Sequence, residues 1–284
     1  MSNNRPASII EFQHTPDRKN SKYLKINDDE ECDACKQSKI KNEINWDIRE
    51  KELLKLLDKY RRSDGRHDCI IPGSGGKDSA YQSHILKTKY GMNPLTITWP
   101  PAMYTDYGYR NFINWINVGG FDNITYRPNG EVFKRLTKLS IQNILHPFQT
   151  FILGQKNLAP KLAKKFGIDL IFYGENEAEY GNPLADNTAS LRKNSYFTNK
   201  DPNNVYLSGI RLDKLISEHN FKYSDLEIYL PMNANEYDKT DIQVHYLGYY
   251  LKWTPQEVYY YATENTGFQP RPFRTQGTYS KYNS

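Results

Sequence analysis

The chain has 284 residues, a hydrophobic fraction of 38% and a formal net charge of +5, so it is long enough for one sizeable core. The sequence has no apolar run as long as a membrane span and no hydrophobic leader after Met1, and we expect a cytoplasmic protein. Its three cysteines exclude a disulfide framework, and the mild positive charge suits a phosphate-bearing ligand better than nucleic acid.

Residues 1–45 show no clear hydrophobic period, and we interpret them as an N-terminal arm. The arm holds Cys32 and Cys35 in a Cys-x-x-Cys pair, a spacing typical of zinc ligands. A structural Zn²⁺ ion needs four ligands, so this pair would be half of a zinc knuckle, and two free thiols are the equal alternative. A helix is then expected from Asp47, its N-cap, to about Gly65.

Residues 46–284 show the pattern of one α/β domain, because short apolar runs alternate with amphipathic runs. The strands are expected at 69–73, 94–99, 123–128 and 169–174, and the helices at 78–90, 108–118, 131–144 and 156–166. Strands that alternate with helices form a parallel sheet, whose ligands bind at the carboxyl ends of the strands.

Residues 181–206 form a long polar stretch rich in Asn, Ser and Asp. Structureless stretches of this length are usually functional or disordered, so we predict a mobile lid or substrate-binding loop that substrate orders. Two more helices are expected at 240–252 and 255–266. The second has Thr254 as the N-cap of a capping box and ends at Gly267.

The most informative stretch is Ser-Gly-Gly-Lys-Asp-Ser at 74–79, between the first predicted strand and the next helix. Glycines let the backbone approach a phosphate, and a helix N-terminus and a lysine attract its charge. Asp78 stands where a Walker A loop needs Ser or Thr and where a dinucleotide fingerprint needs Gly, so both are excluded. Asp78 is expected to hold Mg²⁺ or to orient the loop. The predicted pyrophosphate-binding residues are Ser74, Gly75, Gly76, Lys77, Asp78 and Ser79.

This loop resembles the pyrophosphate loop of the N-type ATP pyrophosphatases, which include GMP synthetase, NAD synthetase, asparagine synthetase and tRNA thiolation enzymes. The resemblance implies an adenine-nucleotide α-hydrolase-like (HUP) core that uses ATP and Mg²⁺. Members of this superfamily transfer AMP to a carbonyl oxygen and release pyrophosphate, and a nucleophile, often ammonia, then displaces AMP.

The loop with its flanks and three further stretches resemble the N-acetyl sugar amidotransferases. These three stretches are "CDACKQSKIKNEINWDIRE", "YGENEAEYG" and "YLKWTPQEVYYYATENTGF". The resemblance covers most of the chain, from about residue 4 onward. It implies a C–N bond-forming ligase that turns the acetamido group of a nucleotide-activated sugar into an acetamidino group. The pathways implied are those of lipopolysaccharide O-antigen and of flagellin glycans, including pseudaminic acid.

The same resemblance implies how ammonia arrives and how the arm is completed. No cysteine stands in a recognisable glutaminase context, so ammonia is expected from a separate glutaminase and cyclase-like pair, or from solution. In the family another Cys-x-x-Cys precedes a segment similar to the start of this chain. We therefore expect the chain to be clipped at both ends and the zinc site to lack half its ligands.

A second candidate cluster follows the predicted strand at 169–174. Its acidic residues are the best acid–base or sugar-hydroxyl candidates, and a solvated acidic loop is the alternative. Gly174 and Asn176 of this cluster are predicted to bind ATP. Glu175 is predicted to be catalytic, together with Lys77 and Asp78 of the loop. Glu179 and Tyr180 are predicted to bind the sugar.

Other residues carry weaker predictions. Trp99, at a predicted strand end, flanks the adenine or packs in the core, with equal weight. Cys69 is expected to be a buried apolar residue. Arg271, Arg274 and Lys281 meet a sugar nucleotide or form a solvated basic tail.

Two other functions stay open on the sequence. A tRNA-modifying enzyme could use the same loop, either in thiolation or in a lysidine-type reaction. Thiolating relatives carry cysteines beyond the loop and none follows Cys69 here, but a lysidine-type activity needs no thiol. A non-catalytic nucleotide-binding subunit is the second alternative, against which Lys77, Asp78 and Glu175 argue.

Overall fold

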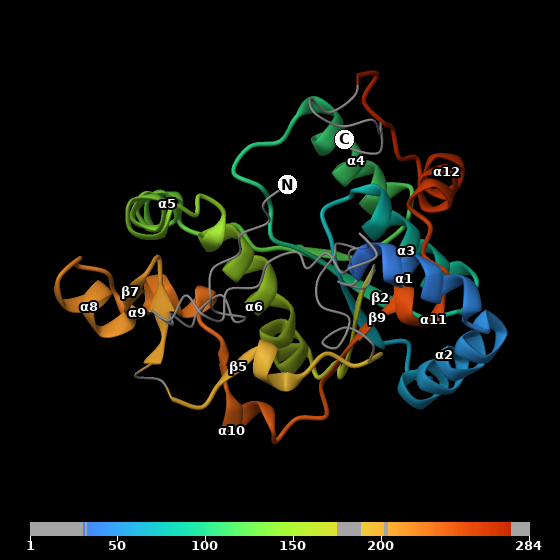
Figure 1. Cartoon of the computed structure of the whole chain (residues 1–284), viewed down its shortest axis with the longest axis horizontal. Helices are drawn as coiled ribbons and strands as arrows, with labels where there is room; N and C mark the ends of the chain where they lie inside the picture. Colours follow the sequence, from blue (N-terminus) through green and yellow to red (C-terminus); the bar gives the residue numbers. More distant parts are fainter. Residues whose placement is uncertain (1–30, 32, 175–188, 202–203, 274–284) are drawn as a thin grey trace.

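The computed structural model describes residues 31, 33–174, 189–201 and 204–273. Its centre is a five-stranded sheet with the order β3-β2-β1-β4-β9, in which every neighbouring pair is parallel (Figure 1). The strands are β1 Cys69–Pro72, β2 Pro94–Thr98, β3 Asn123–Thr125, β4 Leu170–Tyr173 and β9 Gln243–Tyr246. The predicted parallel α/β fold class is therefore confirmed.

Helices cover both faces of this sheet. In Figure 1, α5 and α6 lie to its left, and α1, α2, α3, α11 and α12 lie to its right. The longer helices are α1 Asp33–Glu43, α2 Trp46–Tyr60, α3 Lys77–Thr88, α4 Asp106–Asn117, α5 Gly130–Ile144, α6 Gln149–Phe166 and α12 Pro255–Asn265. The shorter ones are α8 Leu212–Ser217, α9 Tyr223–Leu226, α10 Ala234–Tyr237, α11 Leu247–Tyr250 and the 3₁₀ turns η3 Asn194–Tyr196 and η5 Glu227–Tyr229.

Two short ladders accompany the main sheet. Strand β5 Thr198–Asn199 runs parallel to β8 Met232–Asn233. Strand β6 Tyr206–Leu207 runs antiparallel to β7 Ile210–Arg211.

The central strands are buried on both faces. Ile70 and Ile71 of β1 are both fully buried, but they belong to different hydrophobic clusters because successive side chains point to opposite faces. Ile70 packs in a cluster that includes residues of α5 and α6, and Ile71 packs in one that includes residues of α2 and α3. Near-continuous apolar runs of this kind are typical of parallel sheets.

The order of the strands reverses beside β1. From β1 the chain adds β2 and β3 on one side, and it then crosses over to add β4 and β9 on the other side. Open α/β sheets bind ligands at such a reversal, in the crevice outside the carboxyl ends of the strands. The topology therefore predicts a binding crevice next to the residues that follow Pro72 and Tyr173.

Several predicted elements need correction. The predicted helix at 240–252 is wrong, because its first half is β9, which pairs with β4, and only the single turn α11 follows. Helix α2 is capped by the Asn45 side chain, which accepts from the Ile48 N–H at 3.2 Å, and not by Asp47. Within the described chain, the Thr254 side chain makes no capping hydrogen bond to α12, although Pro255 does open that helix as predicted.

The long stretch predicted to be structureless at 181–206 is folded where the structure describes it. Leu191 forms an antiparallel bridge with His245 of β9, and the Arg192 N–H donates to the Val244 carbonyl at 2.8 Å. Phe197 is 2% exposed and belongs to the core. The expectation of a structureless stretch is wrong for this part, and the role as a lid or substrate-binding loop stays a prediction. Residues 181–188 lie outside the described residues.

The arm predicted at 1–45 is described only from residue 31 onward, with the exception of Cys32. Helix α1 lies against the rest of the molecule, because Lys41 Nζ donates to the Trp253 carbonyl at 2.6 Å. Among the described residues, none of the helices is long and apolar enough to cross a membrane.

Candidate functional site

The loop between β1 and α3 has a backbone that requires glycine. The Gly73 N–H donates to the Ile97 carbonyl at 2.9 Å, which extends the pairing of β1 with β2 by one residue. Gly75 has a φ of +83°, and a Cβ atom there would lie 2.5 Å from the Cα of Phe112 in α4. Both the conformation and the contact exclude a side chain, so the loop rests directly on the backbone of α4.

The Ser79 side chain is hydrogen-bonded to two backbone groups of this loop. Its hydroxyl accepts from the Gly75 N–H at 3.1 Å and donates to the Gly76 carbonyl at 2.9 Å. The residue is only 7% exposed. The sequence predicts a hydroxyl that binds pyrophosphate, whereas in the structure this hydroxyl fixes the shape of the loop.

The N-terminus of α3 leaves room beside Gly76. Gly76 is the N-cap residue, and a Cβ atom there would meet no described residue within 4 Å. The first turn of a helix has N–H groups without intrahelical partners, and the helix dipole adds positive potential. Ser74 is exposed at the same loop. The arrangement fits a phosphate group.

Lys77 and Asp78 pair with each other at the start of α3. Lys77 Nζ lies 2.6 Å from Oδ1 and 2.5 Å from Oδ2 of Asp78. The lysine side chain is 12% exposed and the carboxylate 30%, so both are within reach of a ligand. A phosphate bound in the loop would compete with Asp78 for the lysine, and a carboxylate released in this way has the hard oxygen atoms that Mg²⁺ prefers.

Helix α4 also fixes the segment that follows α12. The Asn111 side chain donates to the Gln269 carbonyl at 2.8 Å and accepts from the Gln269 N–H at 2.7 Å. Asn114 Nδ2 donates to the Gly267 carbonyl at 2.8 Å. Asn111 is 1% exposed and adjoins Gly75, so the chain near Arg271 runs beside the loop.

The other side of the crevice is formed at the end of β4. The Gly174 carbonyl accepts from the Gly248 N–H at 2.9 Å, and a Cβ atom at Gly174 would lie 2.9 Å from Cη2 of Trp253. Gln82 of α3 spans the two strand ends, since its Nε2 donates to the Pro72 carbonyl at 3.3 Å. The predicted residues Glu175, Asn176, Glu179 and Tyr180 lie outside the described residues, and their roles stay predictions.

Trp99 lies in the core of the structure. It is 4% exposed, stacks on Tyr126 at 5.6 Å between ring centroids and covers Gly154 of α6. This is the packing that the sequence offered as the alternative to an adenine contact. The adenine role stays a prediction.

The cysteines do not form a metal site in the described part of the chain, where no group of three or more His, Cys, Asp or Glu could hold an ion. Cys35 is exposed on α1, and Cys32 lies outside the described residues. Zn²⁺ therefore stays a prediction. Cys69 is fully buried and burial raises the pKa of its thiol, so its predicted apolar role is confirmed.

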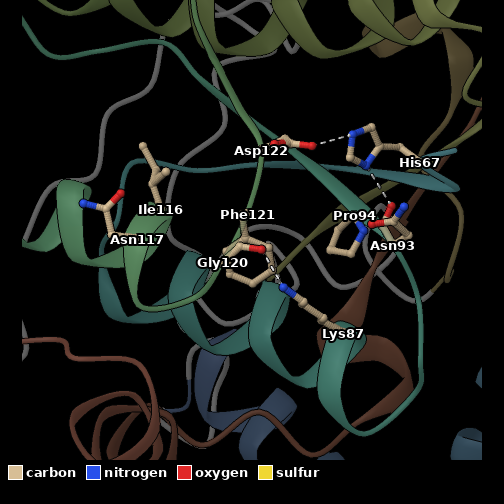
Figure 2. Close-up of a pocket in the computed structure, with 9 residues that line it drawn as sticks. All are labelled: His67, Lys87, Asn93, Pro94, Ile116, Asn117, Gly120, Phe121 and Asp122. Atoms are coloured by element: carbon tan, nitrogen blue, oxygen red, sulfur yellow. Dashed lines mark hydrogen bonds and ion pairs between the residues drawn. The ribbon is translucent and has the colours of Figure 1, made fainter. Parts of the chain in front are cut away.

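A small hollow of about 310 Å³ lies at the opposite edge of the sheet, near the amino ends of β1, β2 and β3 (Figure 2). His67 Nε2 lies 3.2 Å from Asp122 Oδ2 across it. Lys87 donates to the carbonyls of Gly119 and Gly120, so its charge stabilises the turn after α4. This hollow is separate from the loop, and its charged groups His67, Lys87 and Asp122 are engaged in the contacts just described.

Comparison with known proteins gives partial similarities. No known family model matches the chain. A stretch of 58 residues is 34% identical to an uncharacterised protein of Methanocaldococcus jannaschii, and covers 20% of this chain and 21% of that protein.

Two solved structures share part of the fold. An NH3-dependent NAD synthetase from Campylobacter jejuni has a TM-score of 0.38 and 14% identity, and the match covers 48% of this chain and 59% of that one. A predicted subunit of tRNA methyltransferase from M. jannaschii has a TM-score of 0.34 and 15% identity, with 69% and 75% covered. At this level of identity the similarity concerns the fold alone.

Proposed function

We propose that this protein is an ATP-dependent, AMP-forming ligase that activates a carbonyl oxygen and joins the activated carbon to ammonia. The observation that carries the proposal is the Ser-Gly-Gly-Lys-Asp-Ser loop at the strand-order reversal, with the N-terminus of α3 open in front of it. A loop of this shape and charge supports a site for the phosphates of a nucleotide.

Each residue of the loop has a separate role in the proposed reaction. The N–H groups at the start of α3 and Lys77 hold the β- and γ-phosphates, and Ser79 keeps the loop in the shape that presents them. Mg²⁺, when bound, neutralises phosphate charge, and Asp78 is the residue to hold it. The work of the chain is therefore positioning and charge stabilisation of the leaving pyrophosphate.

The proposed reaction has two steps. The carbonyl oxygen of an amide attacks the α-phosphorus of ATP, pyrophosphate leaves, and the amide nitrogen loses its proton. Ammonia then forms a C–N bond with the activated carbon, and the C–O bond to AMP breaks with its electron pair on AMP. All three ammonia hydrogens stay on the product, which is an amidinium ion.

The acceptor that we propose is the acetamido group of a nucleotide-activated sugar, made for a surface polysaccharide or a flagellin glycan in the cytoplasm. The resemblance of residues outside the loop, such as "YLKWTPQEVYYYATENTGF", supports this choice. We also propose a glutaminase and cyclase-like pair as the source of ammonia, and a zinc ion on Cys32 and Cys35 with two further ligands.

A panel of acceptors tests the proposal. The protein is incubated with ATP, Mg²⁺, ammonium chloride and either nucleotide-activated N-acetyl sugars or unmodified tRNA, and AMP and pyrophosphate are measured. We expect AMP only with a sugar, together with a product whose mass has changed by replacement of O by NH. AMP formation with tRNA alone would instead support a lysidine-type enzyme, and ATP binding without AMP from any acceptor would support a non-catalytic subunit.

A further inference from the structure

Gln82 carries a buried oxygen without a hydrogen-bond partner. The residue lies in the second turn of α3 and is 3% exposed. Its Nε2 is used, because it donates to the Pro72 carbonyl, but its Oε1 has no partner within the part of the chain that the structure describes. Buried polar atoms in proteins are nearly always paired, so an unpaired acceptor at this depth indicates that something else supplies the donor.

This oxygen lies next to Gly174, between the carboxyl ends of β1 and β4. It would lie 3.6 Å from a Cβ atom placed on Gly174, the residue that follows β4, while the Gln82 amide nitrogen is fixed at the end of β1. The ring of Trp253 also adjoins Gly174. Asp78 is one turn earlier on the same face of α3. Gln82 Oε1 therefore lies buried beside Gly174, one helical turn from Asp78.

The chemistry of the spot suits a small hydrogen-bond donor. A carboxamide oxygen accepts hydrogen bonds only, and the phosphate groups of ATP that the loop would hold have no donor to offer. Mg²⁺ prefers carboxylate and water ligands, which the neighbouring and more exposed Asp78 fits better than a buried amide beside an indole. Ammonia has three N–H donors, and its ammonium form is also attracted by an aromatic ring.

We propose that Gln82 Oε1 binds the ammonia nucleophile beside Gly174. This inference rests on the proposed function and assigns one residue to its second substrate. An N–H of ammonia donates to Oε1, which leaves the nitrogen lone pair free to form the C–N bond as the C–O bond to AMP breaks. The phosphate loop above it keeps the activated carbon within reach of that nitrogen.

The first test needs no acceptor and uses ammonium chloride as the probe. Thermal unfolding of the whole protein is followed in ammonium chloride, potassium chloride and tetramethylammonium chloride at equal concentration. We expect the unfolding temperature to be highest in ammonium chloride, because a ligand that binds only the folded state stabilises it. An equal rise in potassium chloride, or no ammonium-specific rise, would overturn the assignment.

Three variants locate the effect. Gln82→Met keeps the length of the side chain but has no acceptor, so the ammonium-specific rise should vanish. Gln82→Glu retains oxygen acceptors and should keep it, which distinguishes loss of binding from loss of folding. Gln142→Met, at an exposed position of α5, is the matched control and should behave as the unmodified protein. An unchanged rise in Gln82→Met would contradict the proposal.

A kinetic test separates this inference from the proposed function. With an acceptor found by the panel, Gln82→Met should raise the KM for ammonium about tenfold, the loss expected for one buried hydrogen bond, and leave the KM for ATP unchanged. If no acceptor gives AMP, the proposed function fails, whatever the unfolding temperatures show. If AMP forms and both KM values are unchanged, only the role of Gln82 fails.

Discussion

Two neighbouring glycines of the phosphate loop differ in what surrounds them. Gly75 has a positive φ and touches the backbone of Phe112, whereas Gly76 has a φ of −68° and open space where a Cβ atom would go. Gly75→Ala should therefore lower the free energy of unfolding by more than about 2 kcal/mol, because strain and contact act together. Gly76→Ala should lower it by less than about 1 kcal/mol.

The same two variants, Gly75→Ala and Gly76→Ala, distinguish an effect on folding from an effect on ligand binding. The methyl group of Gly76→Ala enters the space in front of α3, so this variant should lose the rise in unfolding temperature that MgATP gives the unmodified protein. Unfolding measured with and without MgATP checks both variants. A MgATP response in Gly76→Ala as large as in the unmodified protein would show that the phosphate does not approach this end of α3.

Asp78 provides a second test at the scale of one residue. Its carboxylate pairs with Lys77 and is 30% exposed, so Asp78→Asn should leave the unfolding temperature nearly unchanged. AMP formation should fall about a hundredfold or more, the usual cost of losing a charged transition-state contact. Asp58→Asn, which removes an exposed ion pair with Arg61 on α2, is the control and should retain full activity. Turnover within a few-fold in Asp78→Asn would refute the assigned role.

Single residues of the site were predictable only where a local motif marks them. The order Ser-Gly-Gly-Lys-Asp-Ser predicts the loop and its position after β1. Gln82 and Asn111 were missed, because each lies beside a residue far along the chain, namely Gly174 and Gln269. The spacing of Ser79 within the motif predicts a hydroxyl near the phosphates, but not that the loop itself uses it.

At the scale of elements, the buried edge strand β9 gives a pH-dependent contribution to stability. Burial lowers the pKa of His245 from 6.5 to about 4, and its ring lies 2.9 Å from the Tyr250 hydroxyl through Nδ1. The imidazole is therefore neutral in the folded state. Above pH 6.5 it is neutral in the unfolded chain as well, and the stability is fully present.

As the pH falls from 6.5 to about 4, only the unfolded chain takes up this proton, so stability is lost across that window. The loss should amount to about 3 kcal/mol. Urea unfolding at a series of pH values should show it in the unmodified protein and in His219→Gln, but not in His245→Gln. Equal slopes for all three proteins would mean that His245 is protonated without cost in the fold.

The elements that the sequence predicts well are those with a strong period and clear ends. The four predicted strands all appear in the sheet, and α3, α4 and α5 begin within two residues of the expected positions. Strand β9 was missed because a short apolar run with aromatic residues fits a strand or a helix equally, and only its pairing with β4 decides. Helix α1 was missed because its residues have almost no apolar face.

At the scale of the whole molecule, one sheet is shared by the hydrophobic clusters on its two faces. Phe172 of β4 is fully buried in the cluster that includes α2 and α3, whereas Phe166 at the end of α6 is 47% exposed. Phe172→Ala should lower the free energy of unfolding by about 3–5 kcal/mol, because it removes a core ring and leaves a cavity.

Phe166→Ala serves as the matched change and should cost less than about 1 kcal/mol. Urea unfolding of both variants, followed by circular dichroism and by fluorescence, gives the two values. Coincident transitions by the two probes would show that the faces unfold together. A cost for Phe172→Ala as small as that for Phe166→Ala would contradict the packing of β4 described above.

The contact between Gly174 and Trp253 has an optical consequence. The indole ring is 1% exposed, and it touches the backbone at the point where β4 ends and the binding crevice begins. Indole emission changes with the polarity and packing around the ring, so a ligand that enters this crevice alters the light that Trp253 emits. The difference between the spectra of the unmodified protein and Trp253→Phe isolates that signal. If nucleotide binds there as we propose, its binding can be titrated through Trp253 without any attached label.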